Sequence, residues 1–534
     1  MQGGNQMEKT SEKKLKDRVL SVLSENITAI MFACVVVAVM LYMISRQTID
    51  SDTNFILYEG ERILYDGIQH WNTAAVCGAM RTVVQQWLYD LITYAIYKKA
   101  GWHGLFFFNV VQTFALGVLL FRLATVSGSR KRASLIASAV ALWAFISNYG
   151  STRPEMITGI LLAENAILME RYANTNRVKY VLMCLPLVML EANLHASMWI
   201  MHVAVMLPYA IPCGEVMERF GVDTEPGTVR SYRHLPVILA IALSPLCALA
   251  NPYGTEGVMY LFRSAGMNLK AIGVLEMQYP FLVEYHSIFY LAVLILAVKY
   301  IKETKPEHDL LFAGSFFAFA LADRNIIFLS VLSVPLLASV LASFSRRHIR
   351  MNSAENSNIQ NGHRLFPFME ILIIAVSAFI GIHSALQPLV EKDSPTFPVK
   401  AEKYIIVQKR KLRAFRPARI MTHYDNGAYF ERMGEQIYID ARPEIWRKKI
   451  NGKADIYNEF MSVKKITAEK YRKMKKKYEF DYIIAHSGSV LDARCQNDSD
   501  AVLAVRGNGY ALYRLKSGSF SLVRKHVGDY YCDV

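Results

Sequence analysis

The sequence predicts an all-helical domain that crosses a membrane about eleven times, followed by a small α/β domain. The hydrophobic content of 53% and the mean hydropathy of +0.20 exceed what soluble globular chains usually carry. The apolar residues gather in long runs before about residue 390 and become sparse afterwards. Lys and Arg recur in alternate loops between these runs, as expected for a multi-pass membrane protein.

The first apolar run is predicted to be an uncleaved membrane anchor. Four basic residues, Lys13, Lys14, Lys16 and Arg18, precede it, and it lacks a cleavage site of small residues. Residues 1–27 are therefore expected to form a cytoplasmic N-terminal segment.

Eleven apolar segments between residues 28 and 390 are long enough to be spans, and together they form the predicted transmembrane domain. These segments are 28–45, 104–124, 133–148, 154–170, 178–192, 196–212, 235–250, 285–301, 309–323, 325–343 and 368–386.

The basic residues support this threading. With the N-terminus inside, every predicted cytoplasmic loop carries several Lys or Arg, for example Arg130, Lys131 and Arg132 after the second span. The predicted outer connections contain few basic residues. They read SNYGSTRPE, EANLHAS, NPYGTEG and ADRN.

The first outer loop, residues 46–103, is expected to contain interfacial helices. Residues 81–101 are apolar, but Gln85, Asp90 and Lys98 are among the polar residues that interrupt them. Treating them as a span would place the basic SGSRKR loop outside. An amphipathic helix in the membrane interface, with Trp87 at headgroup depth, explains the segment better.

Residues 391–534 are predicted to form an extracytoplasmic α/β domain. Cys495 and Cys532 lie in it, and a disulfide between them is permitted outside the cytoplasm but is not specified by the sequence. Five segments have strand composition and one has helical composition. They are ARIMTHY, QIYIDAR, DYIIAH, AVLAVRG and YALYRLK for the strands and ITAEKYRKMKKKYEF for the helix.

Two function classes are disfavoured by composition. The net charge of +15 is explained by the basic inner loops and the C-terminal domain, so it does not indicate a nucleic-acid partner. The seven cysteines form no CxxC or other metal-type spacing, which disfavours a zinc site.

The predicted topology places polar residues from several outer connections on one face of the membrane. Ionisable groups at this depth are costly unless they face a cavity or find partners, so a converging set indicates a functional site. Any one of them alone is more typical of a helix cap or an interfacial anchor. The candidate residues are Asp50, Asp52, Arg153, Glu155, Asn193, His195, Glu276 and Arg324.

The order of these motifs resembles the GT-C superfamily of membrane glycosyltransferases, more specifically bacterial relatives of the dolichyl-phosphate-mannose-protein mannosyltransferase group. The likeness covers nearly the whole chain. Gln86 stands where those relatives have an acidic residue before Trp87, and Ile56 stands where they often have His. The matching elements are Asp50-Ser51-Asp52-Thr53, Gly60, Gly67, Gln86-Trp87-Leu88, Gly101 to Leu105, Arg153-Pro154-Glu155, Asn193-Leu194-His195, Asn251 to Gly254, Glu276, Arg324-Asn325, Asp425 to Tyr429 and Ile439 to Pro443.

The resemblance implies an inverting transfer of a sugar from a polyprenyl-phosphate carrier to an extracytoplasmic acceptor, which is a glycan, a lipid or a protein. An acceptor hydroxyl needs a carboxylate to take its proton, which makes Asp52 or Asp50 the first candidate base and Glu155 the reserve. A divalent cation held by Asp50 and Asp52 stays an open alternative.

The same resemblance implies an anion-binding set around the departing phosphate. Arg153 and Arg324 are expected to stabilise its charge, with His195 assisting, and arginines can do so without a metal. The substrate-binding set expected from the resemblance is Arg153, His195, Asn193, Glu276, Arg324, Gln86 and Trp87.

Two other classes remain as alternatives. A transporter or a flippase of envelope lipids would also place charges within the membrane, although such proteins usually bind near the midplane and carry internal repeats, which are not evident here. A scaffold for envelope assembly would not depend on the candidate acidic and basic residues.

Overall fold

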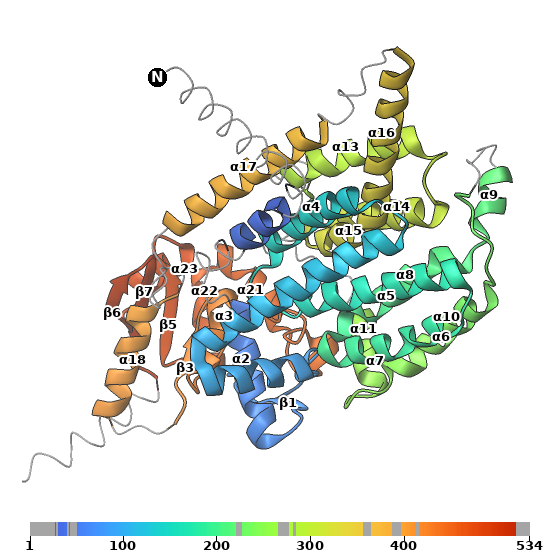
Figure 1. The fold of residues 1–534 in the computed structure, drawn as a ribbon. Helices are drawn as coiled ribbons and strands as arrows, with labels where there is room; N and C mark the ends of the chain where they lie inside the picture. Colours follow the sequence, from blue (N-terminus) through green and yellow to red (C-terminus); the bar gives the residue numbers. More distant parts are fainter. Residues whose placement is uncertain are drawn as a thin grey trace, which may run out of the picture.

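A computed structural model of the chain comprises a helical bundle and a smaller α/β domain packed beside it (Figure 1). Seven residues named above lie outside the residues that the structure describes, namely Lys13, Lys14, Lys16, Arg18, Asp50, Glu276 and Cys532. The described residues are 27, 30–39, 42, 51–219, 227–264, 277–280, 285–355, 365–386, 397–412 and 416–518.

Each predicted span coincides with helical residues wherever the structure describes it. Short elements connect the long helices, namely α9 (Cys213–Arg219), α11 (Thr255–Ser264) and η4 (Asp323–Asn325). The helices at the predicted spans are residues 30–39, the second half of α3 (Trp87–Val126), α4 (Lys131–Tyr149), α5 (Glu155–Thr175), α6 (Lys179–Leu182) with α7 (Cys184–Leu194), η1 (Ala196–Met198) with α8 (Trp199–Ala210), α10 (Leu235–Ala248), α13 (Tyr285–Tyr300), α14 (Pro306–Leu321), α15 (Ile326–Leu332) with α16 (Val334–Glu355), and α17 (Leu365–Leu386).

Few of these helices are long and apolar enough to cross a membrane alone. Among the described residues, Trp87–Val126 meets that criterion by length and composition, and the bent pair Asp323–Leu332 and Val334–Phe344 would supply a second span. Five further apolar helices are shorter. Helix α5 shows one reason, because Glu164, Glu170 and Arg171 interrupt its apolar sequence. The count of eleven crossings therefore stays a prediction.

Helix α3 consists of two helices that meet at Gly101. The backbone of Gly101 has φ 58° and ψ −148°, a region open essentially to glycine alone. This break separates the predicted interfacial helix from the predicted span at 104–124. The helix predicted over residues 81–101 starts at Trp87, because Met80–Arg81 (β2) pairs with Trp71–Asn72 (β1) in a small hairpin.

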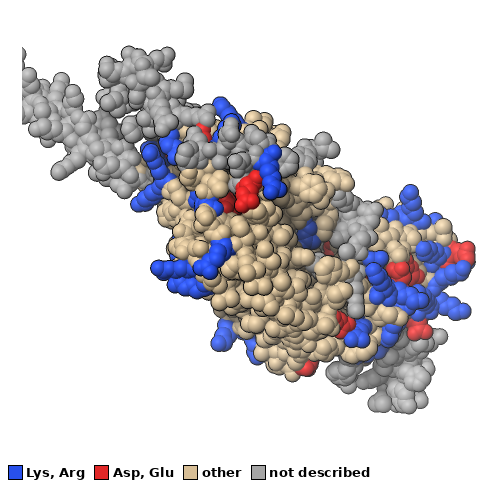
Figure 2. Space-filling model, turned by 90° about the vertical axis from the view of Figure 1, so that its right-hand side faces the viewer, with Lys and Arg blue, Asp and Glu red and all other residues tan. Residues whose placement is uncertain are grey.

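Some helices of the bundle leave large apolar side chains exposed. In α13, Ile288, Ile295 and Val298 are at least 64% exposed. Figure 2 shows one face of the molecule, on which a broad area without charged side chains separates groups of Lys and Arg. Such a surface is typical of a protein embedded in lipid.

The C-terminal domain contains a mixed five-stranded sheet in the order β4-β3-β5-β7-β6. The three strands β3, β4 and β5 are parallel, and the hairpin of β6 and β7 completes the sheet in antiparallel pairing. All five predicted strand segments and the predicted helix are present. The elements are α18 (Val399–Lys411), β3 (Arg419–Met421), α19 (Tyr424–Glu431), β4 (Gln436–Ile437), α20 (Lys448–Asn451), α21 (Ile456–Met461), η5 (Val463–Lys465), α22 (Ala468–Tyr478), β5 (Tyr482–His486), α23 (Val490–Gln496), β6 (Ala501–Gly507) and β7 (Tyr510–Leu515).

The loop before α3 continues this sheet beyond its edge strand β4. The N–H of Ile437 donates to the carbonyl of Ala74 at 2.7 Å, and the N–H of Val76 donates to the carbonyl of Ile437 at 3.0 Å. Ala75 thereby forms a parallel bridge with Ile437. Backbone pairing covers an otherwise open sheet edge, so the C-terminal domain is anchored to the loop and not merely tethered by the chain.

Candidate functional site

The structure brings Asp52 and Arg153 together as an ion pair. Asp52 lies in the first turn of α2 (Ser51–Asp66), and Arg153 lies two residues before α5. The Nη2 atom of Arg153 is 2.9 Å from Oδ2 of Asp52. The Arg153 side chain is 18% exposed and the Asp52 side chain is 27% exposed. A base candidate and a phosphate-binding candidate thus neutralise each other in this state of the protein.

His195 belongs to a hydrogen-bonded set at the same end of the bundle. Its Nδ1 atom is 2.9 Å from Oγ1 of Thr158, and that hydroxyl lies 2.6 Å from Oε1 of Glu191. A carboxylate only accepts, so Thr158 donates its single proton to Glu191 and accepts from His195. The proton of a neutral His195 is therefore on Nδ1, and Nε2 carries the lone pair.

Burial lowers the pKa of His195 to about 4, although the carboxylate of Glu191 opposes this, while the positive charge of Arg324 acts in the same direction as burial. His195 lies between the predicted spans, where α7 ends and η1 begins. A neutral imidazole with a free Nε2 lone pair accepts a hydrogen bond and does not stabilise a phosphate. Assistance to a departing phosphate would require His195 to gain a proton.

The hydrogen-bonded set continues toward the interior of the bundle. Nε2 of His202 lies 3.4 Å from the second oxygen of Glu191, and Nδ1 of His202 lies 2.9 Å from Nδ2 of Asn165. The amide of Asn165 donates to Nδ1, so Nε2 of His202 carries the proton that faces Glu191. All three side chains are fully buried. Glu191 thus receives hydrogen bonds from two sides and holds Thr158 in place.

Trp87, Asn193 and Gln86 use their polar atoms to join elements. Nε1 of Trp87 donates to Oδ1 of Asn193 at 3.0 Å, and Nδ2 of Asn193 donates to the carbonyl of Ala250 at 2.8 Å. Nε2 of Gln86 donates to Asp90 at 3.0 Å. These bonds fix the start of α3 against the ends of α7 and α10, which is a supporting role.

Arg324 and Glu155 complete the candidates within the described residues. Arg324 lies in η4, and its carbonyl accepts a hydrogen bond at 3.1 Å from Tyr149, the last residue of α4. Glu155 is buried at the first position of α5, two residues after Arg153. We call the end of the bundle that carries Asp52, Arg153, His195 and Arg324 the Asp52 end.

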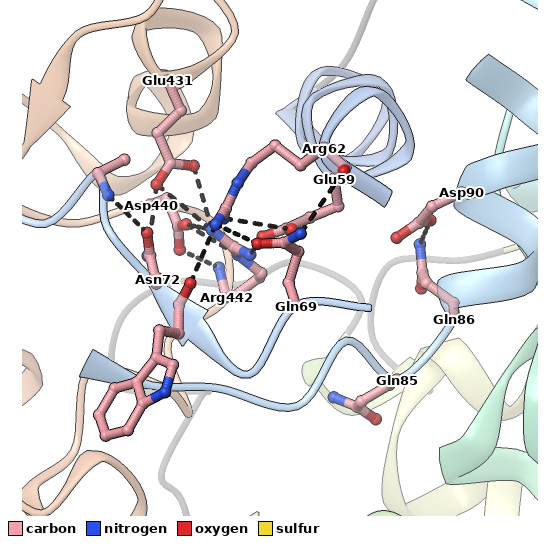
Figure 3. Close-up of polar contacts among 12 residues, drawn as sticks. Glu59, Arg62, Gln69, Asn72, Gln85, Gln86, Asp90, Glu431, Asp440 and Arg442 are labelled. Carbon is pink, nitrogen blue, oxygen red and sulfur yellow. Dashed lines mark hydrogen bonds and ion pairs between the residues drawn. The ribbon is translucent and has the colours of Figure 1, made fainter. Parts of the chain in front are cut away.

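Sequence reasoning missed a buried ionic cluster between α2 and the C-terminal domain (Figure 3). The guanidinium of Arg442 is surrounded by the carboxylates of Glu59, Glu431 and Asp440. Nε of Arg442 lies 2.8 Å from Asp440, Nη2 lies 3.1 Å from Glu431, and Nη1 contacts Glu59. We call these four residues the Arg442 cluster. The signal was Glu59, an acidic residue that lies among the apolar positions Ile56, Leu57 and Ile63 of an amphipathic helix.

Burial raises the pKa of Glu431 well above that of an ordinary glutamate, and the neighbouring Asp440 reinforces the increase while Arg442 opposes it. Three carboxylates around one guanidinium leave an excess of acid, so a proton on Glu431 relieves the repulsion. Arg62 lies near the same cluster and is 3.6 Å from Glu59.

Two glycines allow close backbone approach on either side of the Arg442 cluster: Gly60 between α2 and α3, and Gly427 between α19 and the segment at Ile439. A Cβ atom on Gly60 would come within 2.2 Å of the carbonyl oxygen of Asp90 in α3, and a Cβ atom on Gly427 would come within 2.0 Å of the carbonyl oxygen of Ile439. Both positions therefore require glycine for close backbone approach. Helix α2 is enclosed between α3 and α19, as Figure 3 shows for the residues around Glu59.

The described residues contain no group of three or more His, Cys, Asp or Glu side chains placed to hold a metal ion. Arg153 contacts one oxygen of Asp52, and Asp50 lies outside the described residues. The alternative of a divalent cation held by Asp50 and Asp52 therefore stays a prediction.

No family model and no curated sequence matches the chain. Solved structures do match. The archaeal oligosaccharyltransferase AglB from Archaeoglobus fulgidus, in complex with an inhibitory peptide and a dolichol-phosphate, gives a TM-score of 0.57 at 10% identity and covers 85% of this chain and 69% of its own. ArnT from Cupriavidus metallidurans, bound to undecaprenyl phosphate, gives a TM-score of 0.52 at 9% identity. The alignment covers 91% of this chain and 97% of the ArnT chain.

The chain has the GT-C fold. These two proteins are GT-C membrane glycosyltransferases, so the resemblance predicted from the sequence motifs is confirmed at the level of the fold. The match to ArnT extends over nearly the full length of both chains, so the C-terminal domain belongs to the comparison. Within this GT-C fold, the roles of the individual residues at the Asp52 end remain predictions. A further structure of the same archaeal protein was solved in complex with Zn and sulfate.

Proposed function

We propose that the protein is an integral membrane glycosyltransferase that moves a sugar from a polyprenyl-phosphate donor to an extracytoplasmic acceptor. The observation that carries the proposal is the Asp52–Arg153 ion pair at one end of a bundle with the GT-C fold. Dolichol-phosphate and undecaprenyl phosphate are bound by the two similar proteins, which supports a lipid-linked donor.

The ion pair gives a mechanism for coupling donor binding to base activation. The phosphate of the donor competes with Asp52 for the guanidinium of Arg153, which binds phosphate well. When Arg153 turns to the phosphate, Asp52 is released to accept a proton from the acceptor. Arg324 adds positive charge at the same end of the bundle.

The transfer step follows from these positions. As the acceptor oxygen bonds to the anomeric carbon, its proton passes to the carboxylate of Asp52. The bond from the anomeric carbon to the phosphate oxygen breaks, and its electron pair leaves with the polyprenyl phosphate, whose charge is stabilised by Arg153. Attack from the side opposite the leaving group inverts the anomeric configuration. Glu155, two residues after Arg153, is the reserve base.

The test is sugar transfer by the purified chain in liposomes that contain a radiolabelled polyprenyl-phosphate sugar. We expect Asp52→Asn to lower kcat at least about 100-fold, because the carboxylate no longer takes the proton. Asp66→Asn, at the exposed far end of α2, is the matched control and should leave the rate unchanged. Full transfer by Asp52→Asn at normal folded yield would contradict the assignment.

A lipid flippase is the second candidate, because Glu191 and His202 are fully buried ionisable groups inside the bundle and such groups also mark translocation pathways. The same liposomes distinguish the two functions. A flippase would move labelled lipid between leaflets without changing it chemically, whereas a transferase releases polyprenyl phosphate and a glycosylated acceptor.

A further inference from the structure

The Arg442 cluster connects the C-terminal domain to the helix that carries Asp52. Glu59 lies seven residues after Asp52 on α2, which is about two helical turns, so the two acidic side chains lie on similar faces of the helix. Asp52 contacts the helical bundle through Arg153, and Glu59 contacts the C-terminal domain through Arg442. Helix α2 therefore carries one ionic contact to each domain.

The guanidinium is held in a fixed orientation before it reaches Glu59. Oδ1 of Asp440 accepts the N–H of Arg442 at 2.8 Å and Nε1 of Trp446 at 2.7 Å, while Oδ2 accepts Nε of Arg442. Glu431 is held in turn by Nδ2 of Asn72 at 3.5 Å. Only Nη1 is directed to α2, so the C-terminal domain presents one prearranged donor to Glu59.

The contact is specific to arginine. A planar guanidinium serves three carboxylates in three directions, whereas the ammonium of lysine is a single point charge on a flexible stem. The guanidinium of Arg442 also lies 5.6 Å from the centre of the Phe55 ring. Phe55 is on α2 between Asp52 and Glu59, so the guanidinium contacts the helix at two points.

We propose that Arg442 is a positioning residue that sets the orientation of α2, and with it the approach of Asp52 to Arg153. The inference deepens the proposed function and rests on it for the role of Asp52. It assigns the C-terminal domain a part in the reaction, because the domain holds the base without touching substrate. The Asp440-Ala441-Arg442 sequence is then the component of the domain that serves the membrane site.

Hydrogen exchange by mass spectrometry on the full chain in nanodiscs tests the positioning directly. We expect Arg442→Gln and Glu59→Gln to speed exchange of the 51–66 peptide by about tenfold or more, while peptides from β5 and β7 keep their protection. Arg506→Gln is the matched control, because Arg506 pairs with Asp492 inside the C-terminal domain at 3.0 Å. It should leave the 51–66 peptide unchanged.

An unchanged rate of hydrogen exchange in α2 of Glu59→Gln would overturn the proposal. If Arg442→Gln fails to fold, Glu59→Gln alone provides the test. A second readout is the kinetic split. Displacement of the base should lower kcat in Glu59→Gln with the KM for the donor unchanged, and Arg442→Lys should recover only part of the loss. Equal full activity of Glu59→Gln and the wild type would also overturn it.

The two proposals fail separately. If Asp52→Asn retains transfer, the catalytic assignment is wrong, but the exchange experiment still reports whether Arg442 orders α2. If exchange in α2 is unaffected while Asp52→Asn is inactive, the site stands and the positioning role is wrong.

Discussion

Two buried ionic clusters lie at opposite ends of the molecule and have opposite charge balance. At the far end of α5, Glu170 accepts hydrogen bonds from Tyr209 at 2.7 Å, from Arg230 at 2.9 Å and from His308 at 2.9 Å. Arg230 also reaches Glu307 at 3.2 Å. One central carboxylate is thus surrounded by donors, whereas the Arg442 cluster has one central guanidinium among three carboxylates.

The charge balance of each cluster indicates its role. The Glu170 cluster joins α5, α8 and α14 within a single bundle, and Glu170 receives donors from Tyr209, Arg230 and His308, so we expect it to act as a fixed clamp. The Arg442 cluster joins two domains and holds an excess of acid that a proton on Glu431 relieves. Its contact is conditional, and it lies next to the candidate site, whereas the Glu170 cluster lies at the other end.

The largest effect is expected at the clamp. Glu170→Ala leaves the buried Arg230 and His308 without their shared acceptor, which should cost about 3–5 kcal/mol of unfolding free energy. The midpoint of unfolding in detergent measures this loss. Glu164→Ala on the same helix is the control and should shift stability by less than about 0.5 kcal/mol. Similar midpoints for the two variants would show that the Glu170 cluster is not a clamp.

Arg442→Gln should lower the free energy of unfolding by an intermediate amount, about 1–3 kcal/mol. Protonation of the remaining carboxylates reduces the repulsion among them. The same unfolding measurement applies, with Arg506→Gln as the control. A loss equal to that of Glu170→Ala would remove the distinction between a clamp and a conditional contact.

The dependence on pH should separate the clusters next. Because folding raises the pKa of Glu431, the folded protein binds this proton more tightly than the unfolded chain does. Its contribution is complete below the unfolded pKa and is lost as pH rises through the folded pKa, by at most about 1.4 kcal/mol per pH unit. Glu431→Gln should flatten this alkaline loss in an unfolding series, and an unchanged slope would contradict the assignment.

The smallest effect is expected at Asp492. Desolvation opposes it, but hydrogen bonds from Arg506, Tyr513 and the N–H of Gly488 lower the pKa of Asp492 to about 2. Its stabilisation is present above the unfolded pKa and is lost as pH falls toward 2. Asp492→Asn should therefore reduce stability near neutral pH and weaken the acid dependence, with no change in the alkaline range. A changed loss of stability at alkaline pH in Asp492→Asn would contradict the assignment of that loss to Glu431.

The sequence predicted elements better than contacts. Runs of apolar residues located the long helices of the bundle, and strand composition located β3 to β7, because both signals are local. The break in α3 at Gly101 agrees with the predicted boundary between residues 81–101, which polar residues interrupt, and the apolar span at 104–124. The hairpin at Met80–Arg81 was missed because its strands have two residues each.

The candidate site was predicted in part. Topology placed Asp52 and Arg153 on one face, and the structure joins them at 2.9 Å. The Thr158–Glu191–His202 set was not singled out, because Glu191 and His202 lie within apolar runs and their pairing depends on how α5, α7 and α8 pack. The bond between Glu59 and Arg442 spans 383 positions, and no local pattern specifies such a contact.

Photo-crosslinking with a polyprenyl phosphate that carries a photoactivatable group beside its phosphate tests most directly which end is the functional site. We expect crosslinks to peptides of the Asp52 end, namely α2 and the start of α5, and fewer of them in Arg153→Gln. Crosslinks concentrated on α14 and the 227–234 segment around Glu170, unaffected by Arg153→Gln, would contradict it.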